Sequence, residues 1–182
     1  PAPVAGADNT VVRRLRKIAD YLNAQSLQLQ NGGLIASSLL SRHADTLLSL
    51  GAQSRESLLY ALGYLENEPV QVQHALAVAV RAVDLARRQG YDDSTLKAIA
   101  ASALIHDLGK ASLPATLLES RVPLSDAQRA LLPGHVQLIS ERLADCRWLS
   151  TDVATSVVEQ INERLDGSGY PRGLRAEAID DL

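Results

Sequence analysis

Residues 103–110 read ALIHDLGK, a stretch that places an imidazole and a carboxylate side by side, followed by a lysine. Apolar residues precede it at helical spacing, so we expect a helix that Gly109 terminates. His106 and Asp107 point about 100° apart on a helix, yet near its end both can converge on one ion. An imidazole nitrogen with a carboxylate oxygen suits a divalent metal ion. Lys110 lies one turn beyond His106 and can face an anion bound to that ion.

The same residues allow a structural interpretation. Asp107 and Lys110 could form a surface ion pair at i,i+3 spacing, with His106 as a helix cap. The motif alone leaves the ion pair and the metal site equally open.

A second histidine lies in a strongly helical segment. Residues 71–90 read QVQHALAVAVRAVDLARRQG, with Gly90 as the stop signal. His74 lies at the edge of the face that we expect to be buried. It shares a stripe at helical spacing with Val78, Arg81 and Leu85. Taken by itself, this pattern favours a hydrogen-bonded core histidine over a metal ligand.

A third histidine follows a break in the chain. Ser125 and Gln128 form a capping box, so a helix starts there, and the Pro-Gly pair at 133–134 breaks or kinks it. His135 comes next and opens a stripe towards the same core as His106, where it could be a further ligand. Its local pattern alone favours a cap or an exposed residue.

The last predicted helix begins near Ser150 or Thr151. Its apolar stripe consists of Val153, Val157 and Ile161. This i, i+4, i+8 spacing predicts that Ile161 belongs to the core. The helix leads into INERLDGSGYP, residues 161–171, where two glycines and a proline indicate a sharp turn.

The rest of the chain is helical in pattern as well, with helices expected at residues 10–28, 34–49 and 54–66. Hydrophobic residues make up 46% of the 182 residues but aromatic ones only 3%, and Phe is missing. Leu, Ala and Val therefore supply the apolar surface, and Leu and Ala are strong helix formers. We predict an all-α helical bundle.

Charge and cysteine content exclude several classes of protein. The net charge of −3 gives no general surface for a DNA or RNA duplex. A single cysteine, Cys146, excludes an internal disulfide framework and suits the reducing cytoplasm. No apolar run reaches the roughly 18 residues of a membrane span. The chain begins with Pro1 rather than Met, so we expect a fragment or a processed product.

Two of these motifs occur in an order that resembles a known family. HDLGK, followed about fifty residues later by ERLDGSGYPRGL, is similar to the HD-GYP domain of bacterial signalling proteins. The resemblance covers roughly residues 58–182 and includes His74 and His135 at fitting places. It implies an all-α HD-GYP-like domain at 58–182, truncated at its C-terminal end. Residues 1–57 would be an N-terminal helical extension of unknown role.

The resemblance also implies an activity and its residues. Members of the family cleave cyclic di-GMP with a centre of two or three metal ions, usually iron or manganese. The positions that match metal ligands are His74, His106, Asp107 and His135. Lys110 matches the lysine that contacts the scissile phosphate, so Asp107 and Lys110 are the catalytic candidates and Lys110 is also the substrate-binding one.

The turn is matched as well. Its residues are Asp166, Gly167, Gly169, Tyr170 and Pro171. In the family this turn makes a stiff surface associated with partner contacts, here formed by Gly169, Tyr170 and Pro171.

The chain departs from the family pattern at the metal centre. Two adjacent histidines normally precede the Glu-Arg pair, and here Ile161 and Asn162 stand there. Isoleucine cannot bind a metal, and a neutral amide oxygen is a poor substitute for imidazole. Some members also have a glutamate where this chain has Val70. In the family, a further aspartate ligand and the nucleotide-binding basic residues normally lie in a later helix, and this sequence stops at Leu182, before that helix.

These departures favour a centre with one divalent ion rather than two, and a chain without any ion is also open. They also favour weak or absent phosphodiesterase activity. Three interpretations stay open. The favoured one is a degenerate HD-GYP module that acts by binding a protein partner or cyclic di-GMP. The others are an active cyclic di-GMP phosphodiesterase with altered metal ligation, and a one-metal phosphohydrolase acting on another nucleotide. A homo-oligomer in which a second chain completes the site is also open.

Overall fold

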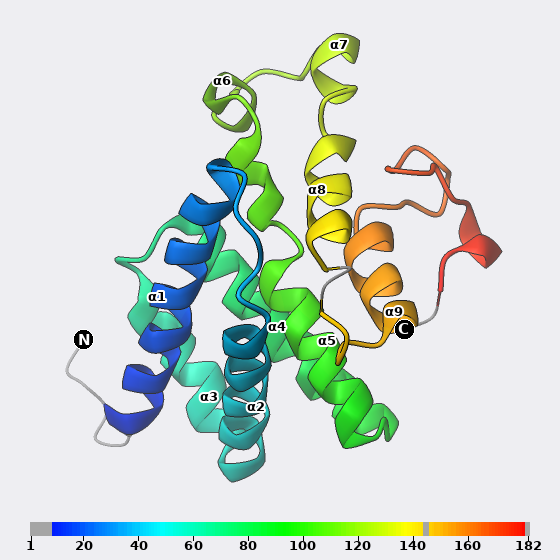
Figure 1. Ribbon diagram of the computed structural model, residues 1–182. Coiled ribbons are helices and arrows are strands. Elements are labelled where there is room, and N and C mark those ends of the chain that lie inside the picture. Colours follow the sequence, from blue (N-terminus) through cyan, green and yellow to red (C-terminus); the bar gives the residue numbers. More distant parts are fainter. Residues whose placement is uncertain (1–8, 144–145, 181–182) are drawn as a thin grey trace.

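The computed structural model describes residues 9–143 and 146–180 (Figure 1). Within these two ranges the regular elements are helices and none is a strand, which confirms the all-α fold. None of the helices in the described part of the chain is long and apolar enough to cross a membrane.

Three helices and a short turn of 3₁₀-helix come first. They are α1 (Asn9–Gln30), α2 (Ser37–Gln53), α3 (Arg55–Ala61) and η1 (Leu62–Leu65). The predicted helices are all present, and the predicted third one tightens into 3₁₀ geometry in its second half. Ser54 begins α3 by accepting a hydrogen bond from the backbone N–H of Ser57.

The long helices α4 (Val70–Gln89) and α5 (Asp93–Ile105) form the centre of the molecule. Gly90 ends α4 in the left-handed conformation at φ 86°, as its position after the helix predicted. Asp92 begins α5 by accepting hydrogen bonds from the backbone N–H groups of Ser94 and Thr95. From Ala98 to Ile105 every residue of α5 is buried, so the segment that follows α5 starts inside the protein.

Gly109 does not end that helix, so the predicted terminus is wrong. α5 ends at Ile105, and η2 (Leu108–Ser112) follows as a 3₁₀-helix. His106 and Asp107 therefore occupy the transition between the two helices, where the change of geometry lets adjacent side chains approach each other.

Short helices connect this region to α8. They are α6 (Ala115–Leu118) and α7 (Asp126–Arg129), and α8 covers Pro133–Leu143. The predicted capping box of Ser125 and Gln128 is present, and the predicted break at 133–134 is the start of α8. Proline fits a first helical position because its missing N–H would have no partner there.

The prediction that Ile161 belongs to the core is wrong. The last helix starts as α9 (Thr151–Ala154) but continues as a π-helix, η3 (Thr155–Glu159). A π-turn rotates the residues after it, so the i, i+4, i+8 stripe loses its register. Val153 and Val158 are buried, whereas Ile161 is 43% exposed. A turn region and the 3₁₀-helix η4 (Ala176–Ala178) complete the described chain.

One continuous hydrophobic core joins these elements. Its fully buried members include Leu15 of α1, Leu40 of α2 and Leu104 of α5. The core therefore includes residues on both sides of the predicted boundary between residues 57 and 58. The N-terminal helices pack directly on the helices that carry the candidate ligands.

Candidate metal centre

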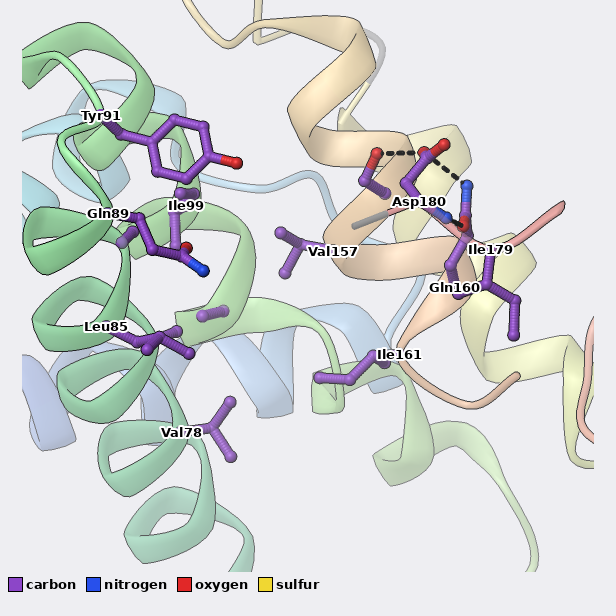
Figure 2. A pocket seen from close by; sticks show the side chains of 14 residues that line it. Val78, Leu85, Gln89, Tyr91, Ile99, Val157, Gln160, Ile161, Ile179 and Asp180 are labelled. Carbon is purple, nitrogen blue, oxygen red and sulfur yellow. Dashed lines mark hydrogen bonds between the residues drawn. The ribbon is translucent and has the colours of Figure 1, made fainter. Parts of the chain in front are cut away.

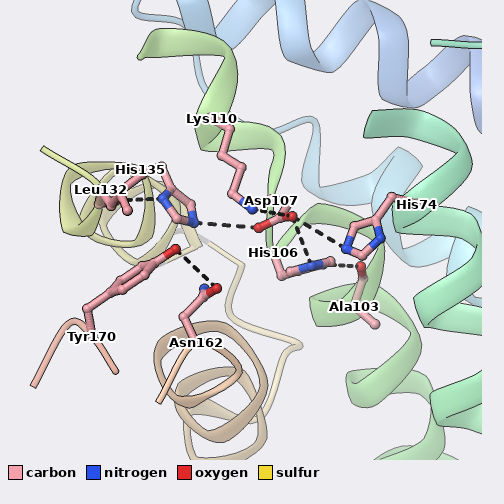
Figure 3. Close-up of polar contacts among 9 residues, drawn as sticks. All are labelled: His74, Ala103, His106, Asp107, Lys110, Leu132, His135, Asn162 and Tyr170. Atoms are coloured by element: carbon pink, nitrogen blue, oxygen red, sulfur yellow. Dashed lines mark hydrogen bonds and ion pairs between the residues drawn. The ribbon is translucent and has the colours of Figure 1, made fainter. Parts of the chain in front are cut away.

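Asp107 is the point on which the candidate ligands converge (Figure 3). Its side chain is 8% exposed and receives a hydrogen bond at 2.7 Å from the Lys110 ammonium. Burial raises the pKa of the Asp107 carboxyl. The imidazoles of His106 and His135, which donate to the carboxylate when they are protonated, and the ammonium of Lys110 outweigh that effect and hold the pKa well below its usual range. Asp107 is therefore ionised, as a metal ligand must be.

His106 is fixed by the end of α5. Its ring Nδ1 lies 2.8 Å from the carbonyl oxygen of Ala103, to which Nδ1–H donates. The proton is thereby held on Nδ1, which leaves the lone pair on Nε2. Nε2 lies 3.4 Å from Oδ2 of Asp107.

His135 repeats this arrangement from α8. Its Nδ1 donates to the carbonyl oxygen of Leu132 at 2.6 Å, and its Nε2 lies 3.5 Å from Oδ1 of Asp107. Both His135 Nε2 and Asp107 Oδ1 are buried and make no hydrogen bond within the described chain. Two electron-pair donors thus face each other inside the protein, an arrangement that a cation between them would satisfy.

His74 approaches from α4 on the open side of the group. Its Nε2 is 3.5 Å from Oδ2 of Asp107, and its side chain is 53% exposed. It is therefore not the core histidine that its local pattern favoured. Burial lowers its pKa, and the opposing charge of Asp107 does not reverse the shift, so the neutral, ligating form is favoured. Ligand atoms of His74, His106 and Asp107 all lie within 4.8 Å of one another.

Both open interpretations of the ALIHDLGK stretch are realised in part. The ion pair of Asp107 with Lys110 exists, but it is partly buried rather than a surface pair. The same carboxylate is the centre of the histidine cluster. The donor set of three imidazole nitrogens and one carboxylate fits a divalent transition metal ion. The residues present thus fit a metal, and the roles assigned to them remain predictions.

Gly109 brings α8 close enough for His135 to join the cluster. A Cβ at this position would overlap the backbone carbonyl of His135. The two backbones can approach this closely only because residue 109 has no side chain. The sequence signalled a glycine here, but as a helix stop rather than as a point of close packing.

The two residues that stand where the resemblance implied paired histidines, Ile161 and Asn162, point in different directions. Asn162 is half-buried, and its Oδ1 accepts a hydrogen bond from the Tyr170 hydroxyl at 3.2 Å. Ile161 lies in an apolar pocket of about 220 Å³ between α4 and the last helix, where it faces Val78 across the gap (Figure 2). The cluster around Asp107 thus receives an amide at its rim and no contribution from Ile161.

The turn after Asn162 closes the other side of the cluster. Tyr170 is half-buried and meets the His135 ring edge-on, with ring centroids 5.9 Å apart. Burial, together with the negative charge of Asp107, raises the pKa of Tyr170, so the phenol stays protonated and donates to Asn162. Tyr170 therefore faces the site. A partner contact by Gly169, Tyr170 and Pro171 remains a prediction.

Glu163 holds this turn together, which the sequence interpretation missed. Its carboxylate accepts hydrogen bonds from the backbone N–H groups of Arg172 at 2.7 Å and Leu174 at 2.8 Å. Gly169 is packed so closely that a Cβ would overlap the backbone of residues 162–164, and Gly167 has φ 77°. The only available signal was that Glu163 belongs to the ERLDGSGYPRGL motif.

Residues 38–180 match the family model described as "HD domain". The chain belongs to the HD domain family. The resemblance to HD-GYP proteins stated from the motifs is confirmed at this level, and the four converging residues lie within the matched range.

Curated relatives extend the comparison. The chain is 26% identical to the cyclic di-GMP phosphodiesterase PA4108 of Pseudomonas aeruginosa. The alignment covers the whole of this chain and 45% of that protein. It is 31% identical to the 3′3′-cGAMP-specific phosphodiesterase 1 of Vibrio cholerae. That alignment covers 59% of this chain and 25% of that protein. The chain thus spans less than half the length of these two HD domain relatives.

A solved structure shares the fold. The HDG"Y"P protein Bd1817 of Bdellovibrio bacteriovorus superposes with a TM-score of 0.72, over 98% of this chain and 57% of that protein, at 18% identity. This likeness establishes that the N-terminal helices and the helices bearing the cluster form an arrangement found in another HD-type protein.

Replacing Gly109 by alanine tests the packing beneath the site. The new Cβ would displace the backbone of His135 from Asp107, and overpacking of this kind costs about 1 to 3 kcal/mol of unfolding free energy. Urea unfolding measures the loss, and titration with Mn²⁺ measures the expected fall in metal affinity. Gly63→Ala is the matched control, because a Cβ there meets nothing within 4 Å. Equal stability of the two variants would contradict the proposed role of Gly109.

Proposed function

We propose that this HD domain binds a cyclic dinucleotide at a centre holding one divalent ion, with weak or absent hydrolysis of the phosphodiester. One observation carries the proposal: the Nε2 atoms of His106 and His135 both face the ionised carboxylate of Asp107, with their Nδ1 protons committed to backbone carbonyls. Ligands oriented in this way suit a metal, and metals in this family serve phosphodiester chemistry.

A single ion is favoured by the histidine content. The chain has four histidines, and three of them surround Asp107. The fourth, His43, packs against Tyr21 with ring centroids 4.7 Å apart. Iron or manganese is the expected ion, since both accept imidazole and carboxylate ligands.

The residues around the ion have separate tasks. A bound ion would supply Lewis-acid polarisation of a phosphodiester oxygen. Lys110, whose side chain is 26% exposed and contacts Asp107, would share its ammonium between that carboxylate and an anionic phosphate. His74 lies at the open side, where a ligand can approach. Tyr170 and Asn162 close the opposite rim, and both side chains are uncharged.

Weak hydrolysis follows from what stands at positions 161 and 162. In a two-ion centre, the second ion helps to stabilise both the attacking and the leaving oxygen. Here Ile161 lies in an apolar pocket, and the amide oxygen of Asn162 is engaged by Tyr170. Positions 161 and 162 thus supply no donor for a second ion, and we expect the stabilisation that this ion would give the transition state to be lost.

The alternative is an active phosphodiesterase, which is how the relatives from Pseudomonas aeruginosa and Vibrio cholerae are named. It is favoured by the retained Asp107 and Lys110, the two catalytic candidates.

Removing one ligand tests binding. We expect His106→Ala to lose at least about tenfold in Mn²⁺ affinity, because loss of even a supporting contact at a metal site costs about 10- to 100-fold. Affinity for cyclic di-GMP, measured by calorimetry with Mn²⁺ present, should fall with it. His43→Ala should change neither, since His43 lies outside the cluster. Unchanged Mn²⁺ binding by a folded His106→Ala protein would contradict the proposed centre.

Restoring the family residues tests the expected loss of hydrolysis. The double variant Ile161→His with Asn162→His should raise the rate of cyclic di-GMP hydrolysis by about tenfold or more, equivalent to about 1.4 kcal/mol of transition-state stabilisation. Leu165→His, at a position 74% exposed, is the control for an added histidine. If the unchanged protein already hydrolyses cyclic di-GMP as fast as the double variant, the chain is an active phosphodiesterase.

A further inference from the structure

A second cavity opens beside Asp107, on the side facing α1. It has a volume of about 430 Å³ and is bounded by α1, the start of α4, η2 and α6. We call it the α1 groove. Figure 1 shows the C-terminal end of α1 beside the segment that follows α5, and Gln30 joins the two by donating to the carbonyl oxygen of Ala111 at 2.9 Å. Asp107 lines the groove, so the groove and the candidate metal centre share that residue.

One face of α1 is turned towards this groove. The lining residues from α1 are Asn23, Ser26, Leu27 and Gln30. Their i, i+3, i+4, i+7 spacing defines a single helical face. Gln71 lines the groove from α4, one turn before His74, so the groove continues along the same side of α4 as the candidate ligand. The N-terminal segment, whose role the sequence left open, therefore supplies a wall of this space.

The charges of the lining exclude a phosphate from the groove itself. Among its residues only Asp107 and Glu119 carry a charge, both negative, and no lysine or arginine lines it. Lys110 lies at the Asp107 end, where it contacts that carboxylate. A nucleotide would therefore place its phosphate at Asp107 and Lys110 and an uncharged part in the groove.

The walls suit a flat ring. Leu27 of α1 is 61% exposed and Leu118 of α6 is 37% exposed, and both line the groove. Large apolar side chains left open to water on two walls of one cavity can cover the faces of a base. A volume of about 430 Å³ also lies within the usual range of ligand pockets.

Two polar groups of the lining, Asn23 and Glu119, can accept hydrogen bonds from a base. Glu119 can only accept. The amide nitrogen of Asn23 donates to Glu68 at 3.2 Å. The amide oxygen of Asn23 is therefore the atom that can accept a hydrogen bond from a ligand in the groove. Guanine presents two neighbouring donors, N1–H and its 2-amino group, which one carboxylate can accept together, whereas adenine has an acceptor nitrogen beside its 6-amino group.

We propose that the α1 groove holds one guanine base of a cyclic dinucleotide whose phosphate lies at Asp107 and Lys110, an inference that rests on the proposed function. In this arrangement α1 is part of the nucleotide site, and Glu119 is a specificity residue for guanine.

Filling the groove tests the proposal. Ser26→Trp places a bulky ring in the lining, whereas Ala24→Trp places the same ring on an exposed part of α1 outside it. With Mn²⁺ bound, we expect Ser26→Trp to weaken cyclic di-GMP binding at least about tenfold and Ala24→Trp to leave it unchanged. Mn²⁺ affinity, measured for each protein, should not move in either. Equal cyclic di-GMP affinity of the two folded variants would overturn the inference while leaving the proposed function intact.

The exposed Glu119 gives a second test without risk to folding. The unchanged protein should prefer cyclic di-GMP to cyclic di-AMP, and Glu119→Gln should reduce that preference by about tenfold, the scale of one base-specific contact. A preference that Glu119→Gln leaves unaltered would overturn the specificity role. Failure of the unchanged, Mn²⁺-loaded protein to bind any cyclic dinucleotide would overturn both the proposed function and this inference.

Discussion

The buried negative charge of Asp107 is the constraint around which the rest of the structure is arranged. A carboxylate in the protein interior is costly unless other groups compensate it. Lys110 compensates it from one side, and the imidazoles of His74, His106 and His135 surround it. In their neutral form, His106 and His135 present an Nε2 lone pair to it, because Nδ1–H of each ring donates to a backbone carbonyl. Because lone pairs do not neutralise the negative charge of Asp107, the carboxylate and the imidazoles together are complementary to a cation.

The histidines that present these lone pairs lie at the ends of helices. His106 at the end of α5 and His135 at the start of α8 each donate Nδ1–H to a carbonyl three residues earlier. That backbone contact selects the tautomer of both rings. Gly109 then permits the close approach of η2 to α8, which brings His135 within 3.5 Å of Asp107. Local backbone geometry thus determines which atoms face the site.

Much of this was accessible from the sequence, because the relevant signals are local. Helical periodicity predicted α1, α4 and α5, and the two motifs with their outlying histidines predicted which four side chains converge. The errors came from geometry that periodicity cannot encode. The π-helix η3 moved Ile161 out of the core, and a change to 3₁₀ geometry ended α5 before Gly109.

Other features depend on tertiary packing and carried no local signal. Tyr170 looked like a surface residue of an exposed turn, and it packs against His135 because Glu163 holds that turn in place. The groove beside Asp107 needs α1 to lie against η2, a contact between residues about eighty positions apart. A sequence pattern gives the face of a helix but not its neighbour.

The central claim is that this HD domain has one ion at Asp107 and no second one. The most direct measurement is the number of iron and manganese ions per chain, by elemental analysis of protein purified without oxygen. The account predicts one ion per chain, lost on replacement of Asp107 by alanine. Two ions per chain, or none, would contradict it.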